Sequence, residues 1–288
     1  MKKRSVLSVA VLLALALPVF AQAPNDFKID LSRSGDAIII TGYTGNVTNV
    51  VIPAEIEGIP VQTIGSSAFR NNKNITSIVI PNTVTTIDNG ASTAAVGAFS
   101  GCSNLSSVTL SNSLTKIGSN AFASCSKLTS IVIPNSVTSI GESAFSGTGL
   151  VSVAIPDSVT SIGNSAFAHC KNLTTINIPN GVKTIGNRTF GGCGFTTFTI
   201  PNGVTAIGYE AFRECSNLVS ISIPNSVKTI GNDAFFKCVN LTTVTVEEGA
   251  EIRFISGNYG VYSNFEGCGK LDVKSQLALK KAGYRGDF

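Results

Sequence analysis

The residues best suited to chemistry in this sequence are seven cysteines and a single histidine. Cysteine thiolates attack electrophiles, ligate zinc and pair as disulfides. Here each cysteine follows a phenylalanine by three residues: Cys102, Cys125, Cys170, Cys193, Cys215, Cys238 and Cys268. This regular placement indicates one position of a repeating unit. No Cys-x-x-Cys pair occurs, so we predict no metal site.

The repeating position favours a structural role for these thiols. A free cysteine packs as a small apolar group. We therefore predict a ladder of buried, reduced thiols. Oxidation between neighbouring units, of Cys102 with Cys125 or of Cys215 with Cys238, is the alternative.

His169 is the only candidate for acid–base chemistry of the imidazole type. The equivalent place in other units is filled by different residue types: Ser124, Gly192, Glu214 and Lys237. Such variation indicates a surface position. A catalytic histidine needs an orienting partner and a nucleophile, and the sequence predicts neither. The carboxylates of Glu210 and Glu214 fit an exposed face. We predict a non-enzymatic protein without a cofactor.

The unit that carries these cysteines repeats along most of the chain. Its landmark is isoleucine followed by glycine, at Ile64, Ile117, Ile140, Ile162, Ile185, Ile207 and Ile230, with Ile87 as a variant. Successive landmarks lie 22 or 23 residues apart, except for one step of 30 residues that holds an insertion at 88–97. A period of this length falls in the leucine-rich-repeat range.

Each unit reads L-x-x-I-x-I-P-N-x-V-x-x-I-G-x-x-A-F-x-x-C. The alternating start predicts a short half-buried strand, which the proline ends because it lacks an N–H. The glycine permits a left-handed turn, and the Ala-Phe segment fits one short helical turn. No unit can bury its apolar face alone, so stacked units must share a core, with Ile176 near its centre. The strands are expected to stack in register.

This joint pattern resembles the BspA-like leucine-rich repeats of bacterial surface proteins from spirochaetes and oral anaerobes. The resemblance covers about 47–268. It implies a mainly-β solenoid of 22–23-residue units, with parallel strands and short helical turns, capped at both ends. It also implies adhesion to host matrix proteins or to other bacteria.

The two ends differ from the repeats. A basic start, an apolar run and small residues predict a signal peptide at 1–21. Removing it lowers Lys plus Arg from 21 to 18 against 17 acidic residues, so the net charge falls to +1. We expect an N-terminal cap at 22–46 and the solenoid at 47–246. A degenerate last repeat and a helical cap should occupy 247–288, with Gly283 ending the helix. Residues 36–53 predict a strand pair.

The export signal predicts a secreted, periplasmic or cell-surface protein without an integral membrane segment after cleavage. No dense basic patch points to nucleic acid. The expected partners are extracellular proteins or cell-surface ligands.

Strand positions that point away from the core are small and uncharged, and we take them as the binding candidates. From the later units these candidates are Thr175, Asn177, Thr197, Thr199, Ser220, Ser222, Thr243 and Thr245. They predict a protein–protein or cell-adhesion scaffold. The plainer alternative is that small residues merely tolerate a sheet surface. The irregular segments 88–97 and 247–264, with Tyr259 and Tyr262, are rival sites. A structural or self-associating envelope module is the alternative function.

Overall fold

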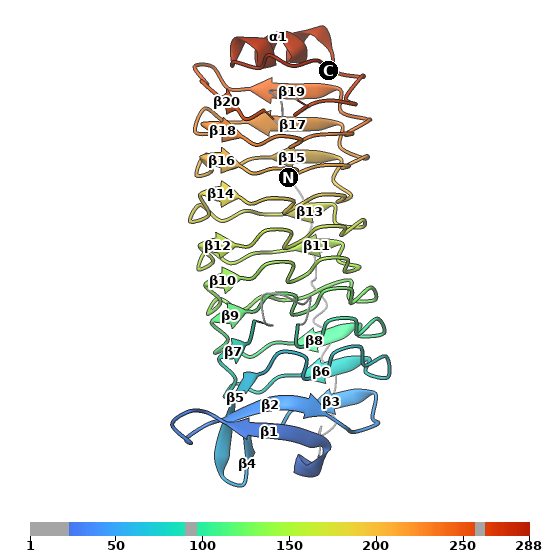
Figure 1. The fold of residues 1–288 in the computed structure, drawn as a ribbon, viewed down its shortest axis with the longest axis vertical. Coiled ribbons are helices and arrows are strands. Elements are labelled where there is room, and N and C mark those ends of the chain that lie inside the picture. The colour runs from blue at the N-terminus through green and yellow to red at the C-terminus, as the bar shows by residue number, and fades with distance from the viewer. Residues whose placement is uncertain (1–22, 90–96, 257–262) are drawn as a thin grey trace, which may run out of the picture.

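The chain forms a tall, single stack of coils, seen in a computed structural model (Figure 1). The structure describes residues 23–89, 97–256 and 263–288. The predicted signal peptide, Tyr259, Tyr262 and most of the insertion at 88–97 lie outside the described residues. The expected mainly-β solenoid is confirmed.

Two columns of short parallel strands run along the stack (Figure 1). The first column is built from the Leu-x-x-Ile-x-Ile segments: β3 (Asn49–Val51), β6 (Ser77–Val79), β8 (Ser107–Thr109), β11 (Ser152–Val153), β13 (Thr175–Ile176), β15 (Thr197–Thr199), β17 (Ser220–Ile223) and β19 (Thr243–Val246). The second column follows the valine of each unit: β5 (Ile59–Ile64), β7 (Thr86–Ile87), β9 (Lys116–Ile117), β10 (Ser139–Ile140), β12 (Ser161–Ile162), β14 (Thr184–Ile185), β16 (Ala206–Ile207), β18 (Thr229–Ile230) and β20 (Arg253–Phe254).

The strands do not form one continuous sheet, which corrects the expectation of full register. Pairing in the first column stops between β8 and β11 and again between β13 and β15, and in the second column between β12 and β14. At the first break, Ile131 and Ile133 are buried while Val132 is 83% exposed. Side-chain packing therefore keeps the alternating pattern there without a backbone ladder.

A third face of the stack, formed by the Ala-Phe segments, carries its own backbone ladder. The Phe122 N–H donates to the Ala144 carbonyl of the next coil at 2.8 Å, and the Ser124 N–H donates to the Ser146 carbonyl at 2.7 Å. The same pair of bonds spans the coils where the second column is interrupted, as in the 3.0 Å bond from the Phe167 N–H to the Thr189 carbonyl. We call this surface the turn face.

Each unit of the turn face is a single hydrogen-bonded turn. The Cys125 N–H, for example, donates to the carbonyl of Phe122, three residues earlier, at 3.1 Å. The residue two places after each phenylalanine is left-handed, with φ of 59° at both Ser124 and His169. A left-handed residue ends helical geometry, which is why these turns do not grow into helices.

A column of stacked aromatic rings forms the core behind the turn face. Ring centroids of successive members lie 5.0 to 6.0 Å apart. The members are Phe69, Phe99, Phe122, Phe145, Phe167, Phe190, Phe212, Phe235 and Phe265, all 0–2% exposed. Ile176, predicted at the core centre, is only half-buried and packs against the edge of the core cluster.

The N-terminal end is closed by an antiparallel pair. β1 (Phe27–Leu31) follows a 3₁₀ turn, η1 (Pro24–Asp26), and pairs with β2 (Ile38–Tyr43). β2 continues in parallel to β5, and β4 (Glu55–Ile56) pairs with the start of β5. The strand pair predicted at 36–53 is wrong: β2 and β3 join different sheets, because β3 already belongs to the first column.

The C-terminal end is closed by α1 (Val273–Lys281), which packs on β19 (Figure 1). The Asp272 carboxylate accepts the Ser275 N–H at 2.7 Å and so caps the helix N-terminus. The Ser275 hydroxyl accepts the Val244 N–H of β19 at 2.8 Å. The helix ends as expected before Gly283, whose φ is 111°. The domain boundaries given above stay a prediction.

Candidate functional site

Six of the eight predicted binding residues lie together in three adjacent strands. Parallel pairing of β15, β17 and β19 aligns them in two rows across the strands. One row is Thr197, Ser220 and Thr243, and the other is Thr199, Ser222 and Thr245. We call this two-row surface the hydroxyl face.

The hydroxyls of this face differ from those of Thr174 and Thr242. Thr174 directly precedes the outward residue Thr175, and Thr242 directly precedes Thr243. Each donates its hydroxyl to a carbonyl of the preceding coil, at 3.3 and 3.2 Å. Those hydroxyls hold coils together. Among the described residues, the side-chain hydroxyls of the hydroxyl face make no hydrogen bond apart from a 3.4 Å contact of Thr243 with Thr242. They are therefore available to a partner.

The other two predicted residues, Thr175 and Asn177, are not brought into this surface. Their coil pairs with β11 and not with β15. The Asn177 amide accepts the Ile155 N–H and donates to the Ile155 carbonyl, both at 2.7 Å. This side chain thus continues the β11–β13 ladder beyond its last backbone pair, and its hydrogen-bonding groups are already engaged.

The rival irregular segments are described only in part. In 247–264, the Glu247 carboxylate accepts the Asn225 N–H at 2.8 Å and so joins the segment to the coil before it. This contact gives the glutamate a structural role.

The cysteine ladder is confirmed: all seven thiols are free and buried. Each donates its S–H to the carbonyl of a phenylalanine in the preceding coil, as from Cys125 to Phe99 at 3.2 Å and from Cys215 to Phe190 at 3.1 Å. Burial raises the pKa of Cys102 and of Cys215 to about 12. At neutral pH such thiols stay protonated, which removes the thiolate that nucleophilic attack or metal binding requires. In the described parts of the chain, no cluster of His, Cys, Asp or Glu is arranged to hold a metal.

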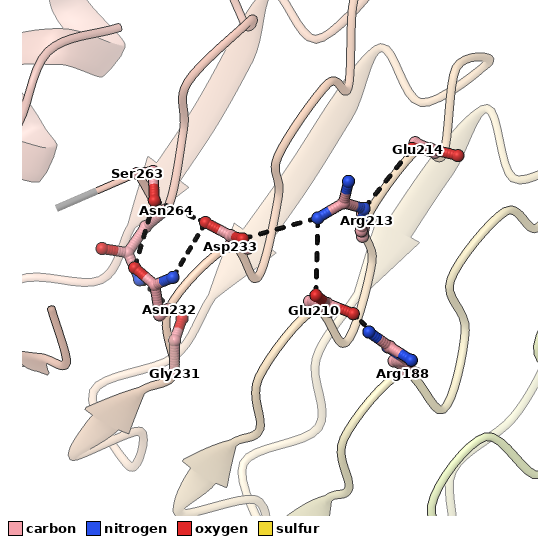
Figure 2. A network of polar contacts seen from close by, with 9 residues as sticks. All are labelled: Arg188, Glu210, Arg213, Glu214, Gly231, Asn232, Asp233, Ser263 and Asn264. Atoms are coloured by element: carbon pink, nitrogen blue, oxygen red, sulfur yellow. Dashed lines mark hydrogen bonds and ion pairs between the residues drawn. The ribbon is translucent and has the colours of Figure 1, made fainter. Parts of the chain in front are cut away.

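Sequence reasoning missed a charged cluster on the turn face (Figure 2). Arg213 lies at its centre, with Nη1 3.4 Å from both Glu210 and Asp233, and Nε 3.4 Å from Glu214. Glu210 also pairs with Arg188 of the preceding coil. This bond and the charges of both arginines lower the pKa of Glu210. The Glu210 carboxylate therefore stays ionised at neutral pH.

Aromatic and polar neighbours extend the cluster. The Arg213 guanidinium stands 4.5 Å from the centroid of the Phe236 ring, a cation–π contact. Asp233 accepts a hydrogen bond from Asn232 at 2.9 Å and another from Ser263 (Figure 2). The sequence does contain a signal for this cluster. Arg188, Glu210 and Asp233 each stand two places before a unit phenylalanine, so stacking brings opposite charges side by side.

The comparisons identify the family. A family model described as "BspA type Leucine rich repeat region" matches 42–170 and 140–271, with six copies. The chain belongs to this BspA-type leucine-rich repeat family, as its sequence pattern indicates. A comparison with curated proteins finds no match.

Several solved structures are similar. A leucine-rich repeat protein of T. pallidum (TpLRR) is 25% identical over 93% of this chain and 99% of that chain, with a TM-score of 0.49. One from Bacteroides ovatus is 21% identical over 88% of this chain and 94% of that chain, with a TM-score of 0.51, which supports the fold. The pneumococcal vaccine antigen PcpA is 17% identical over 82% of this chain and 66% of that chain, with a TM-score of 0.47.

Family membership defines the class of protein: a repeat scaffold of the kind that mediates protein interactions, typically without enzymatic activity. It indicates an exported or cell-surface protein. Within the residues that the structure describes, no helix is both long enough and apolar enough to cross a membrane.

Proposed function

We propose that this chain is exported by its N-terminal signal peptide and acts as an adhesion scaffold, binding host matrix proteins or other cells through the hydroxyl face. The observation that carries the proposal is the alignment of six small, uncharged side chains whose hydroxyls are almost all without partners in the described structure. Thr242, directly before Thr243 in the chain, by contrast donates its hydroxyl to the Val219 carbonyl of the preceding coil.

The geometry of the hydroxyl face favours a broad partner. Strands in a sheet lie about 4.8 Å apart, so three strands span only about 10 Å. A stable interface buries about 800 Å² on each partner. A partner must therefore extend beyond the three strands along the first column. An extracellular protein with a flat or elongated surface meets this requirement better than a small molecule.

The proposal is tested by measuring binding of the purified chain to immobilised fibronectin, fibrinogen, collagen, laminin and whole bacterial cells. Saturable binding that is lost when Thr197, Thr199, Ser220 and Ser222 are together changed to Lys supports it. Binding that survives this change assigns the contact to another face. Absence of binding to every surface rejects adhesion to this panel.

A structural, self-associating module is the second candidate, and one observation favours it. β1 is the outermost strand of its sheet, and two of its apolar side chains are exposed, Ile29 by 39% and Leu31 by 54%. An open apolar edge can pair with another chain. Sedimentation equilibrium separates the candidates: a mass that rises with concentration, and returns to that of a monomer in Ile29→Lys/Leu31→Lys, supports self-association.

A further inference from the structure

A shallow pocket of about 310 Å³ lies on the turn face beside the charged cluster. It spans three coils, and its lining includes Ala168, His169, Arg188, Gly191, Arg213 and Glu214. Gly191 has no side chain to fill the hollow between the larger residues of the neighbouring coils. Figure 2 shows the charged side chains of this region coming from successive turns.

The repeats themselves show that the fold does not require these polar residues. Arg188 stands where other coils have Ser143 or Ser165, and Glu214 stands where another coil has Ser124. Those coils keep the same turn, the same backbone ladder and the same left-handed residue. The large charged side chains are thus additions to a scaffold that folds with serine at the same places.

The charges of the pocket are largely neutralised within the protein. Glu210 pairs with both Arg188 and Arg213, and Arg213 also contacts Glu214. The Arg188 side chain nevertheless remains 64% exposed and the Glu214 side chain 53% exposed, and each uses only one atom in these pairs. The site therefore presents fixed hydrogen-bond donors and acceptors without uncompensated charge. The two glutamates would repel an anion, and the two arginines would repel a cation.

A neutral ligand with adjacent hydroxyl groups fits such a site best. Each hydroxyl both donates and accepts, so it can use a guanidinium edge and a carboxylate oxygen together. Charged partners make the stronger hydrogen bonds. The volume is at the lower limit for small-molecule pockets, about 300 Å³, which suits one ring. The methyl group of Ala168 and the Cα methylene of Gly191 offer an apolar floor for ring C–H groups.

We propose that this pocket binds one neutral monosaccharide ring, free or at the end of a glycan, through Arg188, Glu214 and His169. The inference goes beyond the proposed adhesion function and does not depend on it. The pocket lies on the turn face, whereas the hydroxyl face is built from the first strand column.

The test is ligand-observed NMR and calorimetry with the methyl glycosides of glucose, galactose, mannose, fucose and N-acetylglucosamine. At least one should bind saturably, with an affinity that changes less than twofold between 0.05 and 0.5 M salt because the ligand is neutral. Arg188→Ser and Glu214→Ser should each weaken binding at least tenfold. Both variants carry residues that the scaffold already has at these unit positions.

A third variant fills the pocket. Gly191→Phe places phenylalanine at the unit position of Phe236, and a Cβ at Gly191 would have its nearest neighbour at 3.5 Å, an ordinary contact. It should abolish saccharide binding while the melting temperature stays within a few degrees. The matched control is Lys237→Ser, which changes the unit position of Glu214 in the coil beyond the pocket and should leave binding unchanged.

Three outcomes would overturn the proposal: no glycoside binds; only sulfated or carboxylated sugars bind, with strong salt dependence; or Gly191→Phe binds as well as the unchanged protein. If the unchanged protein binds no matrix protein or cell, or if the hydroxyl-face variants still bind, while glycoside binding is intact, only the adhesion function would be rejected. The two proposals therefore fail independently.

Discussion

The Sγ atom of Cys125 donates a hydrogen bond to the carbonyl of Phe99 in the preceding coil at 3.2 Å. The same carbonyl accepts the Cys102 N–H of its own turn at 3.1 Å. One cysteine position therefore joins two coils while it fills space beside the stacked rings. This relationship explains why the chain repeats cysteine without forming disulfides.

Cys125→Ala should destabilise the fold by about 1–2 kcal/mol, because it removes a buried atom and a hydrogen bond to a buried carbonyl. Cys125→Ser should cost less, since it keeps a donor at the same place. Urea unfolding of both variants measures the difference. Equal stability of the alanine variant and the unchanged protein would show that the thiol contributes nothing.

The raised pKa values of the thiols predict a dependence on alkaline pH. Burial moves the pKa of Cys102 and Cys215 to about 12, against about 8.5 for an unfolded thiol. Below about pH 8 these thiols are protonated in both states and do not affect the pH profile. Above about pH 8.5 only the unfolded chain releases their protons, so stability falls as pH rises toward 12. The free energy of unfolding then falls by up to about 1.4 kcal/mol per pH unit for each thiol.

Chemical unfolding at pH 7, 8, 9 and 10 measures this slope, and iodoacetamide labelling of the native protein gives an independent check. Native thiols should remain unlabelled at pH 9, while urea-unfolded chains label fully. Rapid native labelling at pH 9 would mean that these thiols are exposed or readily ionised.

The sequence pattern predicted the ladder, the repeat and the C-terminal helix, because each depends on a residue type that recurs at a fixed unit position. It did not predict the breaks between strands. Asn177 occupies an outward position like any other, and only the adjacent coil shows that its amide is engaged by the backbone of Ile155, where the β11–β13 ladder ends. Ile176 follows the core pattern yet is only half-buried.

For the binding candidates, too, the sequence pattern did not show the contacts between neighbouring coils. Strand alternation was sufficient to place Thr197 and Ser220 on one face, but it could not show which hydroxyls are engaged by neighbouring coils. The cluster around Arg213 required a comparison of charges at one position across successive units. That comparison aligns Arg188, Glu210 and Asp233 directly from the sequence.

The C-terminal cap depends on Ser275, which is 2% exposed and accepts the Val244 N–H of the last first-column strand. Ser275→Ala should destabilise the cap by about 1–3 kcal/mol, because it leaves a buried N–H without an acceptor. Hydrogen exchange should accelerate in α1 and β19 before the remaining coils. Lys274→Ala, at an exposed site on the same helix, is the control. A uniform acceleration over all coils would contradict a locally held cap.

The stacked rings should couple neighbouring coils strongly. Phe145 is fully buried, with its ring centroid 5.6 and 5.4 Å from those of Phe122 and Phe167. Phe145→Ala should cost about 3–5 kcal/mol. Because repeats are stabilised by their neighbours, the substitution should either broaden the unfolding transition or lower the midpoint of the whole transition. Destabilisation confined to a single coil would argue against neighbour coupling.

The most direct test of the central claim compares two double-lysine variants for binding to the same immobilised matrix protein. Thr197→Lys/Thr199→Lys alters the hydroxyl face, and Ser161→Lys/Thr184→Lys adds the same charge at exposed positions of the second column. We expect at least a tenfold loss of affinity for the first variant and less than a twofold change for the second. Equal losses, or a loss only in the second variant, would contradict binding through the hydroxyl face.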